Sequence, residues 1–228
     1  MKRARPIVAI DGPGGAGKST VARRLAKEFG FTYLNTGAMY RALALAVSEA
    51  GVQPDDPKLE ERIAPILQSM KIEFDGERVR LNGRDVSSAI TRPDISDLAS
   101  SYSTLAPVRA RMRELQRAIG EQGGVVMEGR DIGTAVFPDA ELKFFLDADP
   151  AVRAERRYAE LSAQGAPTSR DEVLRELMER DQRDSGRELA PLRRADDAIV
   201  IDTSNIPIDQ VVCALKERIQ ELYVLKRA

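Results

Sequence analysis

The most constraining feature of the sequence is a glycine-rich stretch that directly follows a short apolar run near the N-terminus. Residues 7–10 read Ile-Val-Ala-Ile, and Gly12–Ser19 fit the pattern G-x-x-x-x-G-K-[ST]. The apolar run is typical of a buried strand, and an amphipathic helix is expected directly after the glycines. In that context the pattern predicts a loop that binds a nucleoside triphosphate, rather than a glycine-rich turn without a ligand.

The chemistry of this loop follows from its residue types. Glycines allow backbone N–H groups to converge on phosphate oxygens, and the helix that follows presents the positive end of its dipole. Lys18 is expected to reach the β- and γ-phosphates, and Ser19 to bind Mg²⁺. The expected ATP-binding residues of the loop are Gly12, Pro13, Gly14, Gly15, Ala16, Gly17, Lys18, Ser19 and Thr20.

Composition excludes several other chemistries. The chain has 228 residues, 43% of them apolar and 31% charged, with a net charge of −1, which indicates a globular protein without a global bias toward nucleic acid or membranes. It has no histidine, so imidazole bases and metal ligands are excluded. Its one cysteine, Cys213, excludes an internal disulfide and is expected in a helix core. No membrane span or signal segment is recognisable, so we expect a cytoplasmic protein.

Alternating helical and extended patterns predict an open α/β parallel sheet with crossover helices. Helices are expected at 19–30, closed by Gly30, at 36–51 and at 57–70, and strands at 31–35, 125–129, 142–148 and 198–203. Between these, residues 71–87 contain Asp75-Gly76 and Asn82-Gly83, the strongest short hairpin signals. We therefore expect a small antiparallel meander there, with Ile72 and Phe74 on the same face as Val79 and Leu81, followed by further helices.

Arginines recur at positions where a phosphate-transferring enzyme would need them. Arg130 and Asp131 follow the strand 125–129, at the carboxyl edge where open α/β sheets bind ligands. Two helical segments carry spaced sets, Arg153, Arg156 and Arg157 in one, and Arg180, Asp184 and Arg187 in the other. Each of these arginines, taken alone, is better explained as a solvated surface residue than as a site residue. Taken together, they favour a kinase that acts on a small anionic acceptor. A GTPase is disfavoured because N-K-x-D and T-K-x-D motifs are missing.

Together the motifs resemble those of the bacterial-type cytidylate kinases, a family of P-loop nucleoside monophosphate kinases. The resemblance extends from "IDGPGGAGKST" and "NTGAMYR" through "GRDVSSAI" and "PVRARMRELQR" to "EGRDIGTAVFPDA", "FFLDADPAVRAERR", "ERDQRDSGRELAPL" and "IDTS". It implies transfer of the γ-phosphoryl group of ATP to CMP and dCMP, with Mg²⁺ as cofactor. It also implies a monomer, and the net charge near zero and the lack of a long apolar stretch predict no nucleic-acid or membrane partners.

The resemblance also implies roles for individual residues. Thr36, Gly37 and Arg41 would hold the acceptor phosphate, with Arg130 and Arg187. Tyr40 would pack beside the nucleotide, while Ser101, Arg109 and Asp131 would contact the cytosine and Arg180 and Asp184 the ribose. Arg153, Arg156 and Arg157 would contact ATP, and the loop 162–169 would form a short lid. The expected catalytic residues are Lys18, Arg41, Arg130, Arg153, Arg157 and Arg187.

Some positions depart from the family pattern or leave an alternative open. Asn35 stands where the family usually has aspartate, and Thr91-Arg92 replaces the usual order of arginine before threonine. Arg109 is the match for the family arginine, with Arg111 as the alternative. Glu128 or Asp147 is the carboxylate near Mg²⁺, directly or through water, and we favour Glu128 because Arg130 and Asp131 place its strand beside the acceptor.

The resemblance predicts one kinase chain with three regions. These are a core of residues 1–36, 98–150 and 190–228, a nucleoside monophosphate-binding region with the meander at 37–97, and a lid arm at 151–189. The rival hypotheses are another small P-loop kinase, acting on UMP, AMP, dTMP or shikimate, and a nucleotide-dependent switch that transfers no phosphate. A nucleic-acid-dependent ATPase is weaker, because the net charge is near zero and aromatic residues make up only 5%.

Overall fold

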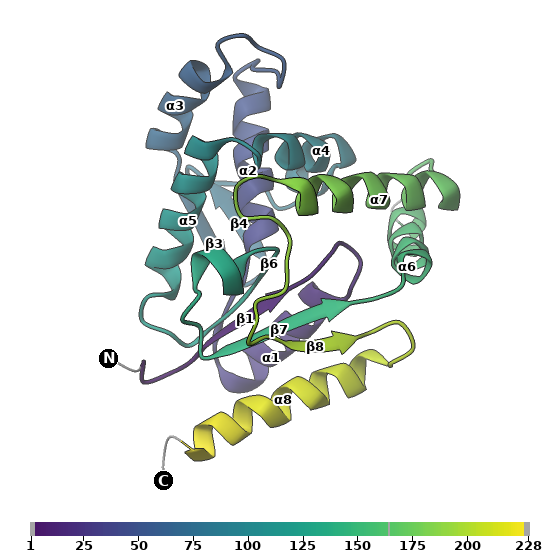
Figure 1. Ribbon diagram of the computed structural model, residues 1–228. Coiled ribbons are helices and arrows are strands. Elements are labelled where there is room, and N and C mark those ends of the chain that lie inside the picture. The colour runs from purple at the N-terminus through teal and green to yellow at the C-terminus, as the bar shows by residue number, and fades with distance from the viewer. Residues whose placement is uncertain (1–2, 164, 226–228) are drawn as a thin grey trace. The chain divides into compact units, whose positions relative to one another are not determined.

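The computed structural model of the protein describes residues 3–163 and 165–225 (Figure 1). The chain divides into two compact units. The first, which we call the P-loop unit, comprises Met1–Tyr33 and Gln122–Ala228, and the second, the helical unit, comprises Leu34–Glu121. Because the units are separately compact, each is described by itself.

The P-loop unit contains a five-stranded sheet in the order β2-β6-β1-β7-β8. Strand β1 lies in its centre and pairs in parallel with both β6 and β7, and β7 pairs in parallel with β8. All five residues of β1 and of β6 are buried, which explains why both read as continuous apolar runs. The strands are β1 (Ile7–Asp11), β2 (Thr32–Asn35), β6 (Val125–Gly129), β7 (Leu142–Asp147) and β8 (Ile199–Asp202).

Two helices, α1 (Lys18–Phe29) and α8 (Ile208–Leu225), pack against one another beside this sheet (Figure 1). Their apolar side chains share one core with the strands, in which Leu25 and Leu215 lie with Ile10 and Phe144, all fully or almost fully buried. Gly30 ends α1 in the left-handed conformation, with φ 60°, as the sequence predicted. This core fixes the start of α1, and with it the loop that precedes Lys18.

Two further helices, α6 (Pro150–Ala163) and α7 (Arg170–Gly186), form a pair in the same unit (Figure 1). Ala154 and Leu161 of α6 pack against Val173 and Leu177 of α7. A capping box starts α7, in which Ser169 accepts from the N–H of Glu172 and the Glu172 carboxylate accepts from the N–H of Ser169. Of the predicted lid loop 162–169, residue 164 lies outside the described residues.

The helical unit gathers its helices around α2 (Thr36–Glu49), most of whose residues are buried. The prediction of an antiparallel meander is confirmed, since Ile72 pairs with Leu81 and Phe74 with Val79. The remaining elements are α3 (Leu59–Ser69), β3 (Ile72–Asp75), β4 (Arg78–Leu81), β5 (Arg84–Asp85), the 3₁₀ turn η1 (Ala89–Thr91), α4 (Pro93–Tyr102) and α5 (Ala106–Gly120).

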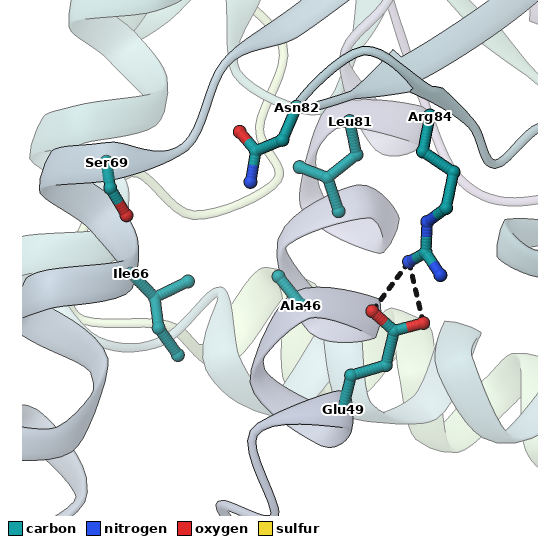
Figure 2. Close-up of a pocket in the computed structure, with 7 residues that line it drawn as sticks. All are labelled: Ala46, Glu49, Ile66, Ser69, Leu81, Asn82 and Arg84. Atoms are coloured by element: carbon teal, nitrogen blue, oxygen red, sulfur yellow. Dashed lines mark hydrogen bonds and ion pairs between the residues drawn. The ribbon is translucent and has the colours of Figure 1, made fainter.

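A surface pocket of this unit lies between α2, α3 and the turn that joins β4 to β5 (Figure 2). Arg84 donates to both carboxylate oxygens of Glu49 across its rim, at 2.6 and 2.7 Å. Both side chains are about half exposed, at 57% and 46%, so this ion pair contributes little to stability. The pocket carries apolar groups such as Ile66 and Leu81, and no cluster of charges of one sign.

The functional division into core, acceptor-binding region and lid arm stays a prediction. Residues 98–121 lie in the helical unit, where α4 packs against α2 and α5 packs against α3 and α2. One other expectation is wrong. Cys213 lies on α8 as expected, but its side chain is exposed rather than in the core, because α8 turns Val211 and Leu215 toward the sheet.

Within residues 3–163 and 165–225, none of the helices is both long enough and apolar enough to span a bilayer.

The helical unit offers a direct test of its packing at Tyr102. The Tyr102 hydroxyl donates to the carbonyl of Val52 at 3.0 Å, and both residues are 1% exposed. Tyr102→Phe removes the donor and leaves a buried carbonyl without it, so we expect a loss of about 1–3 kcal/mol in the free energy of unfolding, measured by urea denaturation. Tyr158→Phe, at a half-buried tyrosine of α6, is the matched control. Equal effects of both changes would contradict this account of Tyr102.

Candidate active site

The glycine-rich loop of residues 12–17 joins the carboxyl end of β1 to the first turn of α1. Gly12 has φ 144°, and a Cβ there would lie 1.9 Å from the carbonyl oxygen of Leu146. Gly15 has φ 76°, and a Cβ there would lie 2.9 Å from the Cβ of Arg153. Only glycine fits these two positions, so the loop is held close to both β7 and α6.

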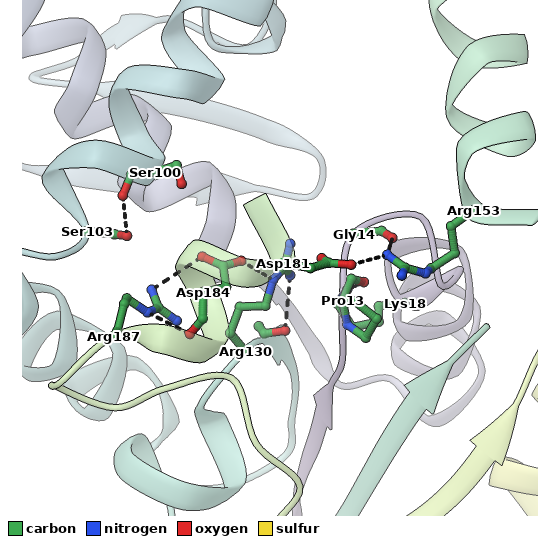
Figure 3. Close-up of polar contacts among 11 residues, drawn as sticks. Pro13, Gly14, Lys18, Ser100, Ser103, Arg130, Arg153, Asp181, Asp184 and Arg187 are labelled. Carbon is green, nitrogen blue, oxygen red and sulfur yellow. Dashed lines mark hydrogen bonds and ion pairs between the residues drawn. The ribbon is translucent and has the colours of Figure 1, made fainter. Parts of the chain in front are cut away.

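Of the side chains that follow the loop, Lys18 is buried and Ser19 is half-buried. The ammonium group of Lys18 donates to the carbonyl of Pro13 at 2.6 Å (Figure 3). The Ser19 hydroxyl donates to Glu128 Oε2 at 2.9 Å, and the Tyr33 hydroxyl donates to Glu128 Oε1. A serine hydroxyl and a carboxylate therefore lie together at the start of α1, an oxygen-rich pair of the kind that Mg²⁺ prefers.

The strand order bears on which carboxylate accompanies Ser19. Both β6, which carries Glu128, and β7, which carries Asp147, flank β1, so adjacency to the loop strand does not separate them. Their contacts do separate them, because Glu128 is 4% exposed and accepts from Ser19. The Asp147 carboxylate instead accepts from the N–H of Ala148 at 2.8 Å and is exposed. The geometry thus favours Glu128 over Asp147 as the partner of Ser19, and its role beside Mg²⁺ stays a prediction.

Arg130 and Arg153 lie beside the loop within the P-loop unit, and Arg187 joins them through Asp184 (Figure 3). Arg153 of α6 donates to the carbonyl of Gly14 at 3.2 Å and to Asp181 Oδ2 of α7 at 2.6 Å. Arg130 Nε, after β6, lies 3.0 Å from Asp184 Oδ2. Arg187, directly after α7, lies 3.8 Å from Asp184 Oδ1. The side chains of Arg153 and Arg187 are only 6% exposed, so these arginines are not solvated surface groups.

The pKa shifts of Lys18 and Asp184 reflect this crowding of positive charge. Burial, together with the charges of Arg130 and Arg180, lowers the pKa of Lys18 to about 7 against the opposing effect of Glu128 and Asp11. Burial acts against ionisation of Asp184, but the charges of Arg130, Arg187 and Arg180 outweigh it and hold the pKa of Asp184 below its usual value. Lys18 and these arginines therefore share one electrostatic environment, suited to an anion.

The other two arginines of α6 have different partners. Arg156 donates to the carbonyl and hydroxyl oxygens of Thr203, at 2.6 and 3.1 Å, and the Thr203 hydroxyl lies 3.1 Å from the carbonyl of Ala16. Arg156 is thus linked to the loop through the residue that follows β8. Arg157 forms an ion pair with Glu160 at 3.1 Å on the same helix. The structure therefore brings Arg153 and Arg156 to the loop and places Arg157 at the surface.

In the helical unit, the predicted residues of α2 lie at its first turns. Asn35 caps the helix by accepting from the N–H of Ala38 at 2.9 Å, a role that needs an oxygen but no charge. Thr36 is buried, and Tyr40 and Arg41 are half-buried. A Cβ at Gly37 would lie 3.2 Å from Arg41 Nη1, so the guanidinium group of Arg41 folds back over this glycine.

The helical unit also contains both candidates for the family arginine, Arg109 and Arg111, and their contacts differ. Arg109 is 7% exposed, donates weakly to the carbonyl of Ser103 at 3.4 Å, and lies 6.0 Å from the ring centre of Tyr40. Arg111 instead donates to the carbonyl of Leu67 at 3.1 Å and pairs with Glu114. The proximity to Tyr40 favours Arg109. Ser101 is half-buried and donates to the carbonyl of Asp97, and Arg92 pairs with Asp94 at the surface.

Sequence reasoning missed three residues of this site. Asp181, the ion-pair partner of Arg153, lies one helical turn before Asp184 on α7, and that spacing could have shown it. Thr203 follows a strand at the ligand-binding edge of the sheet, which is the same signal that singled out Arg130. Asp11, at the end of β1, has no local signal, because its partners lie more than a hundred residues away in the sequence.

Comparisons with known proteins show the family to which the chain belongs. The family model described as cytidylate kinase matches residues 8–221. A curated cytidylate kinase from Chlorobaculum tepidum is 50% identical over 95% of this chain and 93% of that protein. Another, from Syntrophotalea carbinolica, is 52% identical over 90% of this chain and 88% of that protein. A solved structure of an uncharacterized protein from Eubacterium ventriosum has a TM-score of 0.50 at 13% identity, covering 95% of this chain and 99% of that one, and shares the fold. The chain therefore belongs to the cytidylate kinase family.

Proposed function

We propose that the protein transfers the γ-phosphoryl group of ATP to CMP, and also to dCMP, and so forms ADP and the corresponding cytidine diphosphate. The observation that carries this proposal is the identity of 50% to a curated cytidylate kinase over 95% of the chain. The phosphate-binding loop and the arginines beside it supply the chemistry that such a transfer needs.

Charge repulsion is the main obstacle to this reaction. Two unit charges about 4 Å apart repel by about 4 kcal/mol at an effective dielectric constant near 20, and a γ-phosphate that meets a monophosphate involves several such pairs. Buried cations offset the repulsion and stabilise the charge of the transferring group. Lys18, Arg130, Arg153 and Arg187, gathered within one unit, support this role.

For the donor, we propose that backbone N–H groups of residues 12–20 bind the phosphates of ATP. Lys18 would contact the β- and γ-phosphates, and Arg153 the migrating group, since it lies against Gly14. Arg156 would contact ATP from the Thr203 side of the loop. Arg157 would do so only after leaving its ion pair with Glu160.

For the acceptor phosphate, we propose contacts from Thr36, Gly37 and Arg41 of the helical unit and from Arg130 and Arg187 of the P-loop unit. The second pKa of a phosphate monoester is about 6, so at neutral pH the acceptor is mostly a dianion and already nucleophilic. No general base is required. The lack of histidine in the sequence is compatible with this chemistry.

For the nucleoside, we propose that Ser101, Arg109 and Asp131 contact the cytosine, that Tyr40 packs beside it, and that Arg180 and Asp184 contact the ribose. A carboxylate at Asp131 can accept from the exocyclic amine of cytosine. Uracil presents a carbonyl at that place, and a buried carboxylate left without its donor costs about 1–3 kcal/mol. CMP is therefore preferred over UMP by about tenfold or more.

Magnesium fits the residues that the structure brings together at the start of α1. Ser19 supplies a hydroxyl and Glu128 a buried carboxylate that could act directly or through water, and phosphate oxygens are the usual remaining ligands of Mg²⁺. When bound, the ion neutralises charge on the β- and γ-phosphates. A cytoplasmic location, a monomeric state and the lack of nucleic-acid or membrane partners stay predictions.

The proposed function is tested by ADP formation with ATP and Mg²⁺ in the presence of different acceptors. Purified protein is assayed with CMP, dCMP, UMP, AMP, dTMP and shikimate, and without acceptor. We expect turnover with CMP and dCMP, weaker turnover with UMP by about tenfold, and almost none with the others.

Two variants of α1 control this assay. Lys18→Ala should lose transfer to every acceptor, because the buried ammonium group contacts the transferring phosphate. Lys27→Ala, at an exposed lysine in the last turn of the same helix, should keep it. Turnover that prefers another acceptor would replace the proposed substrate, and ATP hydrolysis that does not depend on any acceptor would contradict the proposal.

Asp131→Ala tests the proposed contact with cytosine. We expect the ratio of kcat/KM for CMP to that for UMP to fall by about tenfold, because the variant no longer has the carboxylate that the cytosine amine satisfies. The KM for ATP should change by less than about twofold, since Asp131 is not among the residues proposed to bind ATP. Wild-type discrimination by a folded Asp131→Ala protein would show that another group reads the base.

A further inference from the structure

Asp11 is a buried carboxylate for which the proposed reaction assigns no role. It ends β1 directly before the glycine-rich loop and is 5% exposed. Its Oδ1 accepts from the N–H of Ile132 at 2.9 Å, and its Oδ2 accepts from the N–H of Gly133 at 2.7 Å. A buried charge needs such partners, so the two peptide groups and the carboxylate hold one another in place.

The peptide groups that Asp11 holds are the first two after Asp131. Asp131 begins a single turn of π-helix, η2 (Ile132–Val136), in which its carbonyl accepts from the N–H groups of Ala135 and Val136 at 2.9 and 3.2 Å. A shift of the peptides at 132 and 133 therefore moves the backbone from which the Asp131 side chain extends. Asp131 itself is 6% exposed, so its carboxylate has little room to compensate for such a shift.

The same turn is supported from a second strand. A Cβ at Gly133 would lie 3.1 Å from Cδ of Lys143 on β7 and 3.4 Å from Oδ2 of Asp11. Lys143 is 7% exposed, and its ammonium group donates to the carbonyl of Pro138 and to the carboxylate of Asp197. Gly133 is thus enclosed between β1 and β7, and Asp11 is the side chain that hydrogen-bonds to its backbone N–H.

We infer that Asp11 positions the carboxylate of Asp131 through the peptide groups of Ile132 and Gly133, and that it thereby helps to set the preference for cytosine. The inference rests on the proposed function, in which Asp131 accepts from the cytosine amine. A hydrogen bond to a base edge depends on placement within about 0.5 Å, so a residue that fixes the backbone beside Asp131 affects selectivity without touching the nucleotide.

The charges of Asp11 and Asp131 also affect one another. Burial raises the pKa of Asp11 to about 6, and the nearby charge of Asp131 acts in the same direction, while the N–H groups of Gly133 and Ile132 oppose the shift. The two carboxylates are therefore close enough to repel. The hydrogen bonds from the N–H groups of Ile132 and Gly133 stabilise the charge of Asp11 against this repulsion.

Asp11→Asn tests the inference with the smallest change of shape. The amide oxygen can accept from only one of the two N–H groups, and the amide nitrogen then faces the other as a second donor. We expect the ratio of kcat/KM for CMP to that for UMP to fall by about tenfold, an effect typical of losing a group that orients a binding residue. The KM for ATP should change much less than the KM for CMP.

Two comparisons separate positioning from a merely structural role. Asp202→Asn makes the same change at the end of β8, where an exposed carboxylate accepts from the N–H of Ser204, and it should leave the ratio unchanged. In an Asp131→Ala background, Asp11→Asn should cause no further loss of selectivity, because Asp11 acts through Asp131. A folded Asp11→Asn protein that keeps wild-type selectivity, or effects of the two changes that simply add, would overturn the inference.

A second variant covers the case in which Asp11→Asn does not fold. Gly133→Ala disturbs the same turn by placing a methyl group against Lys143 without changing any polar group, and it should also reduce selectivity for CMP. Unchanged selectivity in folded Gly133→Ala protein would then overturn the inference. A wild-type enzyme with no preference for CMP over UMP would instead refute the proposed reading of cytosine, which is a separate failure.

Discussion

The structure depends on burying several positive charges around one backbone loop. Lys18 and Arg153 both donate to carbonyl groups of the loop, and the side chain of Arg153 is 6% exposed. Buried charges are costly unless they are paired, and here Asp181 and Asp184 of α7 supply the pairing for Arg153 and Arg130. The position of α7 beside α6 therefore follows from the charges of the site as well as from the apolar contacts of Leu161 and Leu177.

The backbone of the loop imposes a second constraint, since its neighbours approach it closely. Gly12 faces the carbonyl of Leu146 and Gly15 faces Arg153, so β7 and α6 are both fixed against the loop. Asp11, at the end of β1, joins the loop to the turn that carries Asp131. One strand end thus connects the residues proposed for the donor phosphates with those proposed for the acceptor base, which explains why a carboxylate is kept buried at this position.

Local patterns in the sequence predicted most of the elements, because continuous apolar runs, glycine caps and Asp-Gly or Asn-Gly turns act over a few residues. The loop, the strands β1, β6, β7 and β8, and the meander were all found in this way. Contacts between distant segments could not be predicted, such as those of Arg153 with Asp181 or Asp11 with Gly133. The choice between Glu128 and Asp147 could not be predicted either, because the strands that carry them both flank β1. The exposure of Cys213 could not be predicted because it depends on how α8 is rotated about its axis.

The central claim is that the buried positive charges beside the loop are arranged for a triphosphate, and the most direct test is the titration of Lys18. NMR of ε-labelled lysine would follow this group, assigned by the loss of its signal in Lys18→Ala protein. The account predicts a pKa of about 7 in the free protein, against an ordinary value of 10.5, and a clear rise when ATP binds and supplies negative charge. An ordinary pKa in the free protein, or no change on binding ATP, would contradict it.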